Sequence, residues 1–255
     1  MRLAVLSDIH GNLTALEAVL QDMEQAGGID LTWCLGDLAA FGPRPAECIR
    51  RLKALAEADE GKKFKVIGGN TDRYLLTGER PKFLMAENDE AFQKSRAYWR
   101  TLNDAILWGV DQLSFEDYEF LKKINGHELS KKIDGYGHMI GYHAIPGNDE
   151  TALFPDTPEA EASDFFLDRE GWLGVGGHTH IQMDRKLGSW RAINVGSVGL
   201  PTDVKGQAGW GLFTFEDGKA QVELRRVPFD AEVVIAELGA VGYPQVEWTG
   251  GQLRV

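Results

Sequence analysis

The chain has 255 residues, of which 43% are hydrophobic and 26% are charged, a balance typical of a globular protein that excludes wholesale disorder and collagen-like repeats. Acidic residues outnumber basic ones by 39 to 27, and the resulting net charge of −12 disfavours duplex nucleic acid and anionic membranes as partners. The two cysteines, Cys34 and Cys48, form no CxxC motif and predict a reducing, cytoplasmic location. No apolar run approaches the roughly 20 residues of a membrane span.

The first third of the chain alternates between short apolar runs and amphipathic segments. Residues 13–23 carry Leu and Met at helical spacing, and residues 46–58 form a second predicted helix. Three apolar runs flank these helices and are typical of buried parallel strands: residues 3–6, 31–35 and 64–67. The order strand, helix, strand, helix, strand predicts a βαβ sheet.

Residues 83–124 have a different residue pattern from the first third of the chain. They are rich in aromatic residues within amphipathic helical patterns. This segment predicts two or three helices inserted between sheet elements. Two interpretations stay open: the inserted helices form a cap, or they are ordinary flanking helices. No linker rich in Pro, Gly or Ser divides the chain, so residues 1–255 are expected to form a single domain that contains this insertion.

The second half of the chain is richer in strands and hairpins than the first. Asp217-Gly218 marks a hairpin turn, and a helix is predicted near residues 158–169. Further strands are predicted over residues 127–133, 138–143, 172–175, 190–195, 210–216 and 221–227. This content favours an α/β fold with two sheets packed face to face and helices outside over one doubly wound sheet.

Side chains of the kinds that bind metals recur just after the predicted strands. They are Asp8 and His10, Asp37, Asn70, His143, and His178 with His180. Because ligands bind at the carboxyl ends of strands in open α/β sheets, we expect these clusters to converge. Carboxylate and imidazole without thiolate suit borderline divalent metals such as Mn²⁺, Fe²⁺ or Zn²⁺. Each cluster alone also fits a turn or a helix cap, but five in succession favour a metal site.

Together these motifs resemble those of the calcineurin-like metallophosphoesterases. The matching segments run in order: Asp8-Ile9-His10-Gly11-Asn12, Gly36-Asp37, Gly69-Asn70, His143 and Gly177-His178-Thr179-His180. Residues 194–199 and 225–230 are similar to a compact prokaryotic branch that includes phosphodiesterases and relatives of diadenosine tetraphosphate hydrolases. The resemblance implies a four-layer αββα sandwich of two mixed sheets, with a two-metal site between the sheet edges.

The resemblance also implies a ligand set and a reaction. Asp8, His10 and His180 correspond to the ligands of one ion, Asn70, His143 and His178 to those of the other, and Asp37 to the carboxylate that bridges both. Asn12, Arg73, Asn194 and Ser197 are candidates for supporting the ligands or contacting substrate. Mn²⁺ is the expected ion, with Fe²⁺, Zn²⁺ or Ni²⁺ as alternatives. A hydroxide bridging the two ions would attack a phosphodiester, a phosphomonoester or a nucleotide.

One position departs from the family pattern. Much of the family has His directly after the motif asparagine, as general acid for the leaving group, whereas this chain has Thr71. Asp72 therefore joins Asp37 and Asn70 as a candidate catalytic residue, because it can orient a ligand histidine or relay a proton through water. The alternative is that Asp72 caps a helix beginning at Arg73. Without a strong acid, good leaving groups should be favoured.

Two other functions remain as alternatives. One is a non-catalytic interaction protein on the same fold, like the retromer subunit that resembles this family. All seven ligand positions hold ligand-type residues, which favours the enzyme. The other is a nuclease of short single strands. The expected partner is a small phosphorylated substrate such as a nucleotide, and a homo-oligomer stays open. Five basic residues near the insertion favour a solvated helix face, and the alternative is that some of them reach a substrate phosphate: Arg80, Lys82, Lys94, Arg96 and Arg100.

Overall fold

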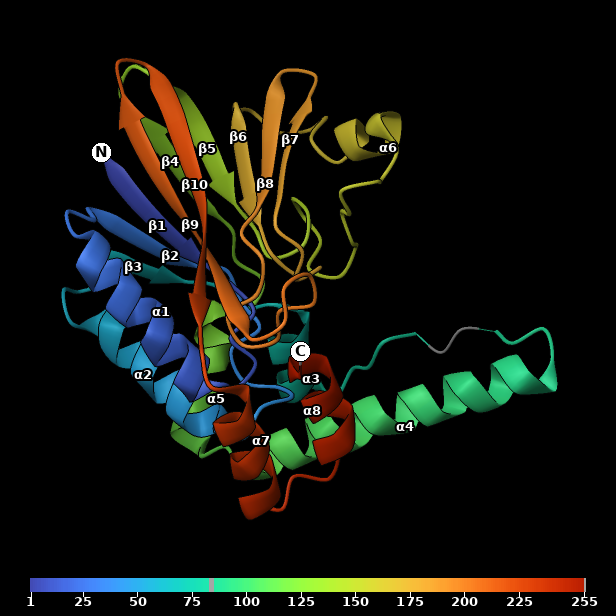
Figure 1. Cartoon of the computed structure of the whole chain (residues 1–255). Helices are drawn as coiled ribbons and strands as arrows, with labels where there is room; N and C mark the ends of the chain where they lie inside the picture. Colours follow the sequence, from blue (N-terminus) through green and yellow to red (C-terminus); the bar gives the residue numbers. More distant parts are fainter. Residues whose placement is uncertain (83–84, 255) are drawn as a thin grey trace.

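The protein is built on two five-stranded sheets that face each other (Figure 1). The structure is a computed structural model that describes residues 1–82 and 85–254. The first sheet has the strand order β10-β9-β1-β2-β3. Its strands are β1 (Arg2–Leu6), β2 (Leu31–Cys34), β3 (Phe64–Val66), β9 (Gln207–Glu216) and β10 (Lys219–Pro228). The predicted apolar strands β1, β2 and β3 pair in parallel, whereas β9 pairs antiparallel with both β1 and β10.

The second sheet has the strand order β4-β5-β6-β8-β7 and is also mixed. Its strands are β4 (Leu129–Ile133), β5 (Gly137–Gly141), β6 (Leu173–Gly176), β7 (Met183–Leu187) and β8 (Trp190–Asn194). β5, β6 and β8 form a parallel centre, and β4 and β7 add antiparallel edges. The parallel strands of both sheets therefore direct their carboxyl ends into loops that hold the predicted ligands.

The space between the sheets is filled by alternate side chains of each strand. In β1, Leu3 and Val5 point into this space, and Ala4 and Leu6 point toward the helices. Trp33 of β2 is 1% exposed and packs on Gly141 of the second sheet, where an added Cβ would lie 2.7 Å from the indole. The strand alternation thus produces one core between the sheets and a second core beneath the helices.

Helices cover the outer faces of both sheets, so the predicted αββα sandwich is confirmed (Figure 1). On the first sheet lie α1 (Leu13–Ala26) and α2 (Pro45–Glu57), both of which were predicted. On the second sheet, α6 (Glu159–Asp164) and the chain beside it cover the hydrophobic outer face. In the described part of the chain, no helix is both long and apolar enough to cross a membrane.

The predicted insertion forms two helices, α4 (Asp89–Asp111) and α5 (Phe115–Ile124). α5 buries Phe120 and Leu121 against the helical layer of the first sheet. α4 is buried only in its C-terminal half, through residues such as Leu102, and its N-terminal half projects away from the sheets (Figure 1). Residues 83–84, where the predicted segment begins, lie outside the described residues. Because α5 is a flanking helix, any capping role falls to α4.

Several elements differ from the sequence-based expectation. β7 was not predicted, because only its two end residues are apolar, as suits a short edge strand. The helix near residues 158–169 is shorter than expected, because turns begin after Asp164. The C-terminal helices α7 (Ala231–Ala240) and α8 (Val246–Leu253) were also missed. α7 does carry a start signal, since the Asp230 carboxylate accepts hydrogen bonds from two backbone amides.

We expect Trp33→Ala to lower the free energy of unfolding by about 3–5 kcal/mol, because it empties the core between the two sheets. Urea denaturation followed by circular dichroism measures this loss. Trp172→Ala is the matched control, since that indole is 53% exposed, and it should cost far less. Equal losses for the two variants would contradict the packing described here.

Candidate metal centre

The seven predicted ligands converge where the strands of both sheets end. Asp8 and His10 follow β1, Asp37 follows β2, Asn70 begins α3 (Asn70–Thr77), His143 follows β5, and His178 and His180 follow β6. Their side chains form two groups whose donor atoms lie within 4.8 Å of one another, Asp8 with His10 and His180, and Asp37 with His143 and His178. The predicted convergence therefore occurs, and it draws on strands from both sheets.

The first group surrounds one carboxylate oxygen. Asp8 Oδ1 lies 3.3 Å from His180 Nε2 and 3.8 Å from His10 Nε2, and the two imidazole nitrogens lie 3.0 Å apart. Among the described residues, Asp8 Oδ1 is buried without a hydrogen-bond partner. A buried carboxylate oxygen without a donor is costly unless a cation satisfies it, so this group fits a metal ion.

The second group is arranged around the side-chain oxygen of Asn70. Asn70 Oδ1 lies 3.0 Å from His143 Nε2 and 3.1 Å from His178 Nδ1. Asp37 Oδ2 completes the group at 3.5 Å from His143 Nε2. Oxygen and nitrogen donors that meet in this way also fit a divalent ion.

Asp37 belongs to the second group and also faces the first. Its Oδ2 atom is 3.7 Å from His10 Nε2 in the first group as well as 3.5 Å from His143 Nε2 in the second. Its Oδ1 atom accepts a hydrogen bond of 2.9 Å from the backbone amide of Thr71, which fixes the carboxylate orientation. One oxygen thus faces both groups, as the predicted bridging role requires.

Each of the four imidazole rings is oriented by a backbone carbonyl on the side away from the centre. The distances are His10 Nδ1 to Ala40 O 3.1 Å, His143 Nδ1 to Leu35 O 2.8 Å, His180 Nδ1 to Leu200 O 2.7 Å, and His178 Nε2 to Glu150 O 3.1 Å. A ring nitrogen that donates its proton to a carbonyl leaves the other nitrogen to coordinate a metal ion once that nitrogen is deprotonated.

The backbone of the ligand loops is strained. Five ligands have positive φ angles: Asp8 58°, His10 48°, Asp37 55°, His178 69° and His180 60°. Each such residue costs about 1–2 kcal/mol relative to ordinary backbone, so surrounding contacts must hold it. Backbone hydrogen bonds between loops do so, among them His10 N to Asp37 O at 2.9 Å and Asp8 N to Gly36 O at 3.0 Å.

Two glycines allow the ligands to approach their neighbours. A Cβ on Gly69 would clash with the Asp37 carboxylate and lie 2.7 Å from His143 Cε1. A Cβ on Gly177 would clash with the Asp8 carboxylate. Any other residue at either position would displace a ligand.

The domain model of the calcineurin-like phosphoesterase superfamily matches residues 1–218. The chain belongs to the calcineurin-like phosphoesterase superfamily. The uncharacterized protein MJ0912 of Methanocaldococcus jannaschii is a relative with 30% identity, covering 98% of this chain and 96% of that protein. The family predicted from the motifs is therefore confirmed, and the superfamily is one that uses two metal ions, in agreement with the two ligand groups.

Solved structures share the fold. A metallophosphoesterase from Sphaerobacter thermophilus has a TM-score of 0.70 at 26% identity, covering 99% of this chain and 98% of that chain. The hypothetical protein PH1004 from Pyrococcus horikoshii OT3 has a TM-score of 0.78 at 23% identity, covering 96% and 94%, and supports the fold alone. A symmetrical bis(5'-nucleosyl)-tetraphosphatase of Cronobacter sakazakii is 36% identical over 72 residues, which span 28% of this chain and 24% of that protein.

Three of the predicted supporting residues form hydrogen bonds to the loops that carry the candidate ligands. None of the three lines the cleft beside those ligands. Asn12 accepts a hydrogen bond from Ala15 N at the start of α1 and donates one to Gly199 O. Ser197 Oγ donates to the backbone oxygen of Asp8 at 2.8 Å. Asn194 Nδ2 donates to Gly177 O and to Thr179 Oγ1, within the segment that carries His178 and His180. Each residue therefore fixes backbone next to a ligand.

Arg73 is committed to carboxylates. Its guanidinium donates two hydrogen bonds to Asp149, at 2.8 and 2.9 Å, and a third to Glu150 at 3.0 Å. The backbone oxygen of Glu150 in turn faces His178 Nε2. Of the two roles predicted for Arg73, this geometry favours ligand support over substrate contact.

Asp72 belongs to neither of the two ligand groups. Its carboxylate accepts hydrogen bonds from Leu38 N at 2.9 Å and Gly69 N at 3.0 Å, and it is fully buried. Burial raises the pKa of Asp72 to about 7, and the charge of Asp37 adds to this effect. Helix α3 begins at Asn70 rather than at Arg73. Asp72 therefore does cap a helix, as the alternative predicted, but from within its first turn rather than from the residue before it. The geometry favours capping over a catalytic role.

A cleft of about 390 Å³ opens beside the ligands. Its metal side is formed by His10, Asp37, Asn70, His178 and His180. Its other side includes aromatic residues that the sequence analysis did not predict, namely Phe41, Tyr74, Tyr98 and Trp248. These come from four separate parts of the chain and follow no motif, so only the fold brings them together. None of the five basic residues near the insertion lines this cleft.

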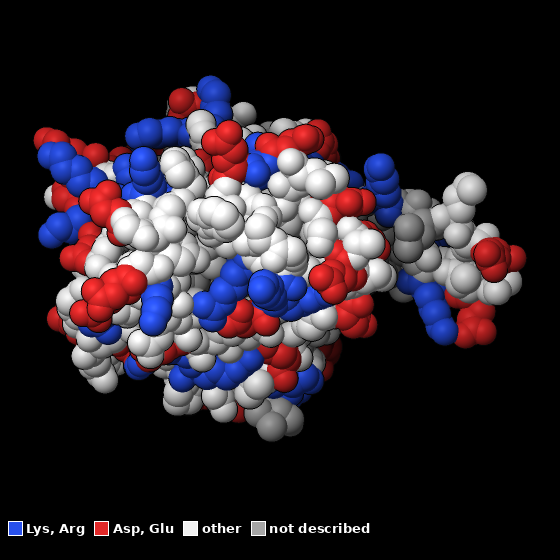
Figure 2. Space-filling model, turned by 90° about the horizontal axis from the view of Figure 1, so that it is seen from above, with Lys and Arg blue, Asp and Glu red and all other residues white. Residues whose placement is uncertain are grey.

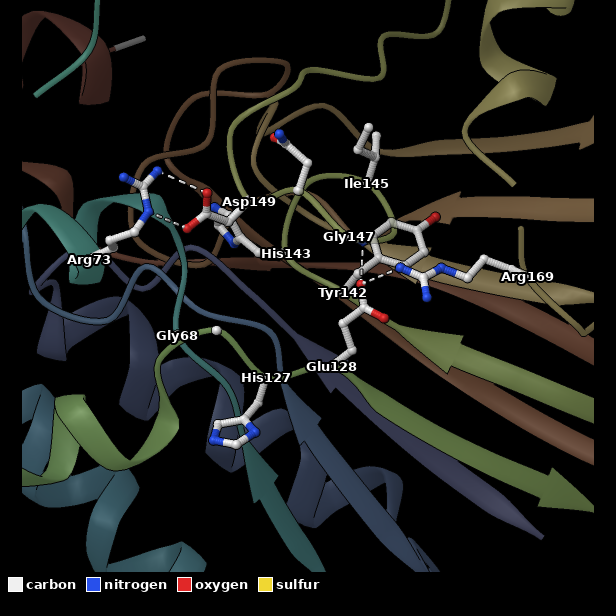
Figure 3. Close-up of a pocket in the computed structure, with 12 residues that line it drawn as sticks. Gly68, Arg73, His127, Glu128, Tyr142, His143, Ile145, Gly147, Asp149 and Arg169 are labelled. Atoms are coloured by element: carbon white, nitrogen blue, oxygen red, sulfur yellow. Dashed lines mark hydrogen bonds and ion pairs between the residues drawn. The ribbon is translucent and has the colours of Figure 1, made fainter. Parts of the chain in front are cut away.

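A second cavity, of about 530 Å³, borders His143 (Figure 3). Figure 3 shows that its charged side chains pair with one another, Arg73 with Asp149 and Arg169 with Glu128. The arginines of this cavity are therefore already neutralised, which makes it a poorer site for a phosphate than the cleft.

The electrostatics of the centre favour ionised carboxylates. Burial alone would raise the pKa of Asp8, but His180 beside it lowers the value to about 2. Burial also opposes ionisation of Asp37, yet His143 and His10 hold its pKa well below the usual range. Burial would lower the pKa of His143, but Asp37 raises it to about 10. His143 therefore carries a proton at neutral pH when no metal competes for it.

Metal binding should release protons, because a ligand imidazole must be neutral and His143 is protonated below a pKa of about 10. The apparent affinity for Mn²⁺ should consequently rise with pH between about pH 6 and 8. Calorimetric titration of metal-free protein in buffers with different ionisation enthalpies measures the protons released. His143→Ala should release about one proton fewer. Heats that do not depend on the buffer would contradict this electrostatic description.

Proposed function

We propose that the protein is a phosphoester hydrolase that depends on two divalent metal ions. The observation that carries this proposal is the position of Asp37 Oδ2, which lies 3.5 Å from His143 Nε2 and 3.7 Å from His10 Nε2. A carboxylate oxygen between two imidazole groups offsets the repulsion of two closely spaced cations. A protein that only bound partners would not require this complete, strained ligand set, so the interaction-protein alternative is disfavoured.

The chain's own residues prepare the site for the ions. We assign Asp8, His10 and His180 to one ion and Asn70, His143 and His178 to the other, with Asp37 shared. When bound, the two ions supply an acidified water as nucleophile and positive charge for the phosphoryl oxygens. Mn²⁺ is the proposed ion, and Fe²⁺, Zn²⁺ and Ni²⁺ suit the same oxygen and nitrogen donors.

The proposed substrate is a small phosphorylated molecule, either a phosphodiester, a phosphomonoester or a nucleotide. Figure 2 shows basic and acidic side chains interspersed on one face, without an extended basic stripe, and the net charge is −12. A duplex nucleic acid is therefore disfavoured. The local match to a bis(5'-nucleosyl)-tetraphosphatase supports a nucleotide.

The buried free thiols of Cys34 and Cys48 support a cytoplasmic location.

Thr71 leaves the leaving group without a proton donor at the expected position. The residue is buried and lines the cleft, and within the described residues its Oγ1 atom has no hydrogen-bond partner. A hydroxyl does not titrate near neutral pH, and Asp72 is held by backbone amides. We therefore propose that the leaving group departs without a proton from a side chain.

Asp37→Asn should lower kcat by at least about a hundredfold, or about 2.7 kcal/mol, because asparagine keeps the shape of the bridge but removes its charge. Hydrolysis of p-nitrophenyl phosphate with added Mn²⁺ measures the effect. Chelation of the wild type should abolish activity, and Mn²⁺ should restore it. The exposed Asp111→Asn is the control and should leave kcat unchanged. Full activity in metal-free protein, or a loss below about tenfold in Asp37→Asn, would exclude the proposal.

The rate should depend steeply on the pKa of the leaving group, because no side chain protonates it. A series of substituted phenyl and alkyl phosphates, compared by kcat/KM, measures this dependence once the chemical step is shown to limit the rate. Thr71→His should help alkyl esters more than nitrophenyl esters, since general acids contribute roughly 10²–10⁴-fold when well placed. A flat dependence in the wild type would mean that another group donates the proton.

A further inference from the structure

The cleft has two chemically different sides. One side holds the candidate metal ligands. The other is lined mostly by aromatic and aliphatic residues from three helices and three loops: Phe41, Tyr74, Pro81, Tyr98, Leu102, Leu200 and Trp248. A substrate whose phosphate lies at the candidate ligands can therefore place its remaining atoms against these aromatic and aliphatic side chains.

Aromatic rings continue from the ligands into the cleft. The ring centroids of His10 and Phe41 lie 5.4 Å apart, and those of Phe41 and Trp248 lie 5.7 Å apart in an edge-to-face arrangement. Phe41 has a φ of 79°, a conformation that bulky residues rarely adopt. Such strain persists only where surrounding structure enforces it, so the position of this ring is a built feature of the site.

α4 contributes to the same surface. Tyr98 lines the cleft although it is 55% exposed, and Leu102 lies one turn further along the helix. α4 is held in place by the C-terminal segment, because Trp108 packs edge-to-face on Tyr243 at 5.1 Å. A half-exposed tyrosine beside a buried metal centre can stack on a planar ligand without losing a core contact.

The described lining of the cleft contains no lysine or arginine. The arginines nearest in sequence to its lining residues are engaged elsewhere: Arg73 bonds to Asp149, and Arg80 bonds to Asn103 and to backbone oxygens. Within this lining, a second phosphate next to the scissile one would find no lysine or arginine side chain to pair with. The cleft is suited to one phosphoryl group attached to an uncharged, planar group.

We propose that the aromatic side of the cleft binds a planar ring of the substrate, a nucleobase or an aryl group. Trp248, Phe41 and Tyr98 provide the stacking surface, and the cleft selects a single-phosphoryl ester over a polyphosphate. Base–aromatic stacking is sequence-tolerant, so the site recognises a ring rather than one particular base. This inference rests on the proposed hydrolase function and specifies its substrate class.

The test compares AMP with ribose 5-phosphate as inhibitors of metal-loaded enzyme hydrolysing p-nitrophenyl phosphate. AMP should have the lower inhibition constant by about tenfold, because only AMP carries a planar nucleobase that can stack on the aromatic residues. Trp248→Ala should remove most of this ratio at unchanged metal content, and Trp248→Phe should retain it. Tyr98→Ala provides a second variant at an exposed position, should Trp248→Ala not fold. Trp172→Ala, an exposed tryptophan outside the cleft, should keep the full ratio.

A second comparison addresses the number of phosphates. The reference substrate is a nucleoside 5'-(p-nitrophenyl) phosphate, a diester with a single phosphoryl group. With Mn²⁺ in excess, diadenosine tetraphosphate should have a kcat/KM at least about tenfold below that of this diester. Equal inhibition by AMP and ribose 5-phosphate, an unchanged ratio in both cleft variants, or a preference for the tetraphosphate would each overturn the inference while leaving the hydrolase intact. Absence of metal-dependent hydrolysis on every substrate would instead overturn the proposed function.

Discussion

The carboxylate of Asp37 is the constraint on which the rest of the centre depends. It is buried between imidazoles from both sheets, so its charge must be balanced on two sides at once. Its orientation requires the amide of Thr71, and its space requires that residue 69 have no side chain. The start of α3 and the ends of strands from both sheets therefore meet at one side chain.

The loops that carry the candidate ligands depend on hydrogen bonds from their neighbours. Left-handed backbone at five ligands opposes folding, and buried, uncompensated polar groups add to that cost. Hydrogen bonds between loops offset both effects, including those from Asn12, Asn194 and Ser197. These three residues lie inside the protein because each one links loops that belong to different strands. The positions of the candidate ligands therefore depend on these hydrogen bonds as well as on the strands.

The sequence was informative wherever one local rule decides the structure. Apolar runs identified the parallel strands, and ligand-type residues after them identified the centre, because strand ends of a parallel sheet meet in space. It was uninformative where distant segments cooperate. β7 is too polar to resemble a strand, and α8 contains Gly250-Gly251, which disfavour a helix in isolation. The aromatic side of the cleft could not be predicted, since no spacing relates Phe41, Tyr98 and Trp248.

The match to the superfamily ends at residue 218, whereas Trp248 lies beyond it on the last helix. A chain shortened to the matched part would keep all seven candidate ligands but lose one wall of the cleft and the packing of Tyr243 on α4. The candidate ligands and the Trp248 part of the cleft are therefore encoded in different stretches of the chain. A relative that shares all seven candidate ligands need not share Trp248, so the metal-binding motifs by themselves do not specify the aromatic side of the cleft.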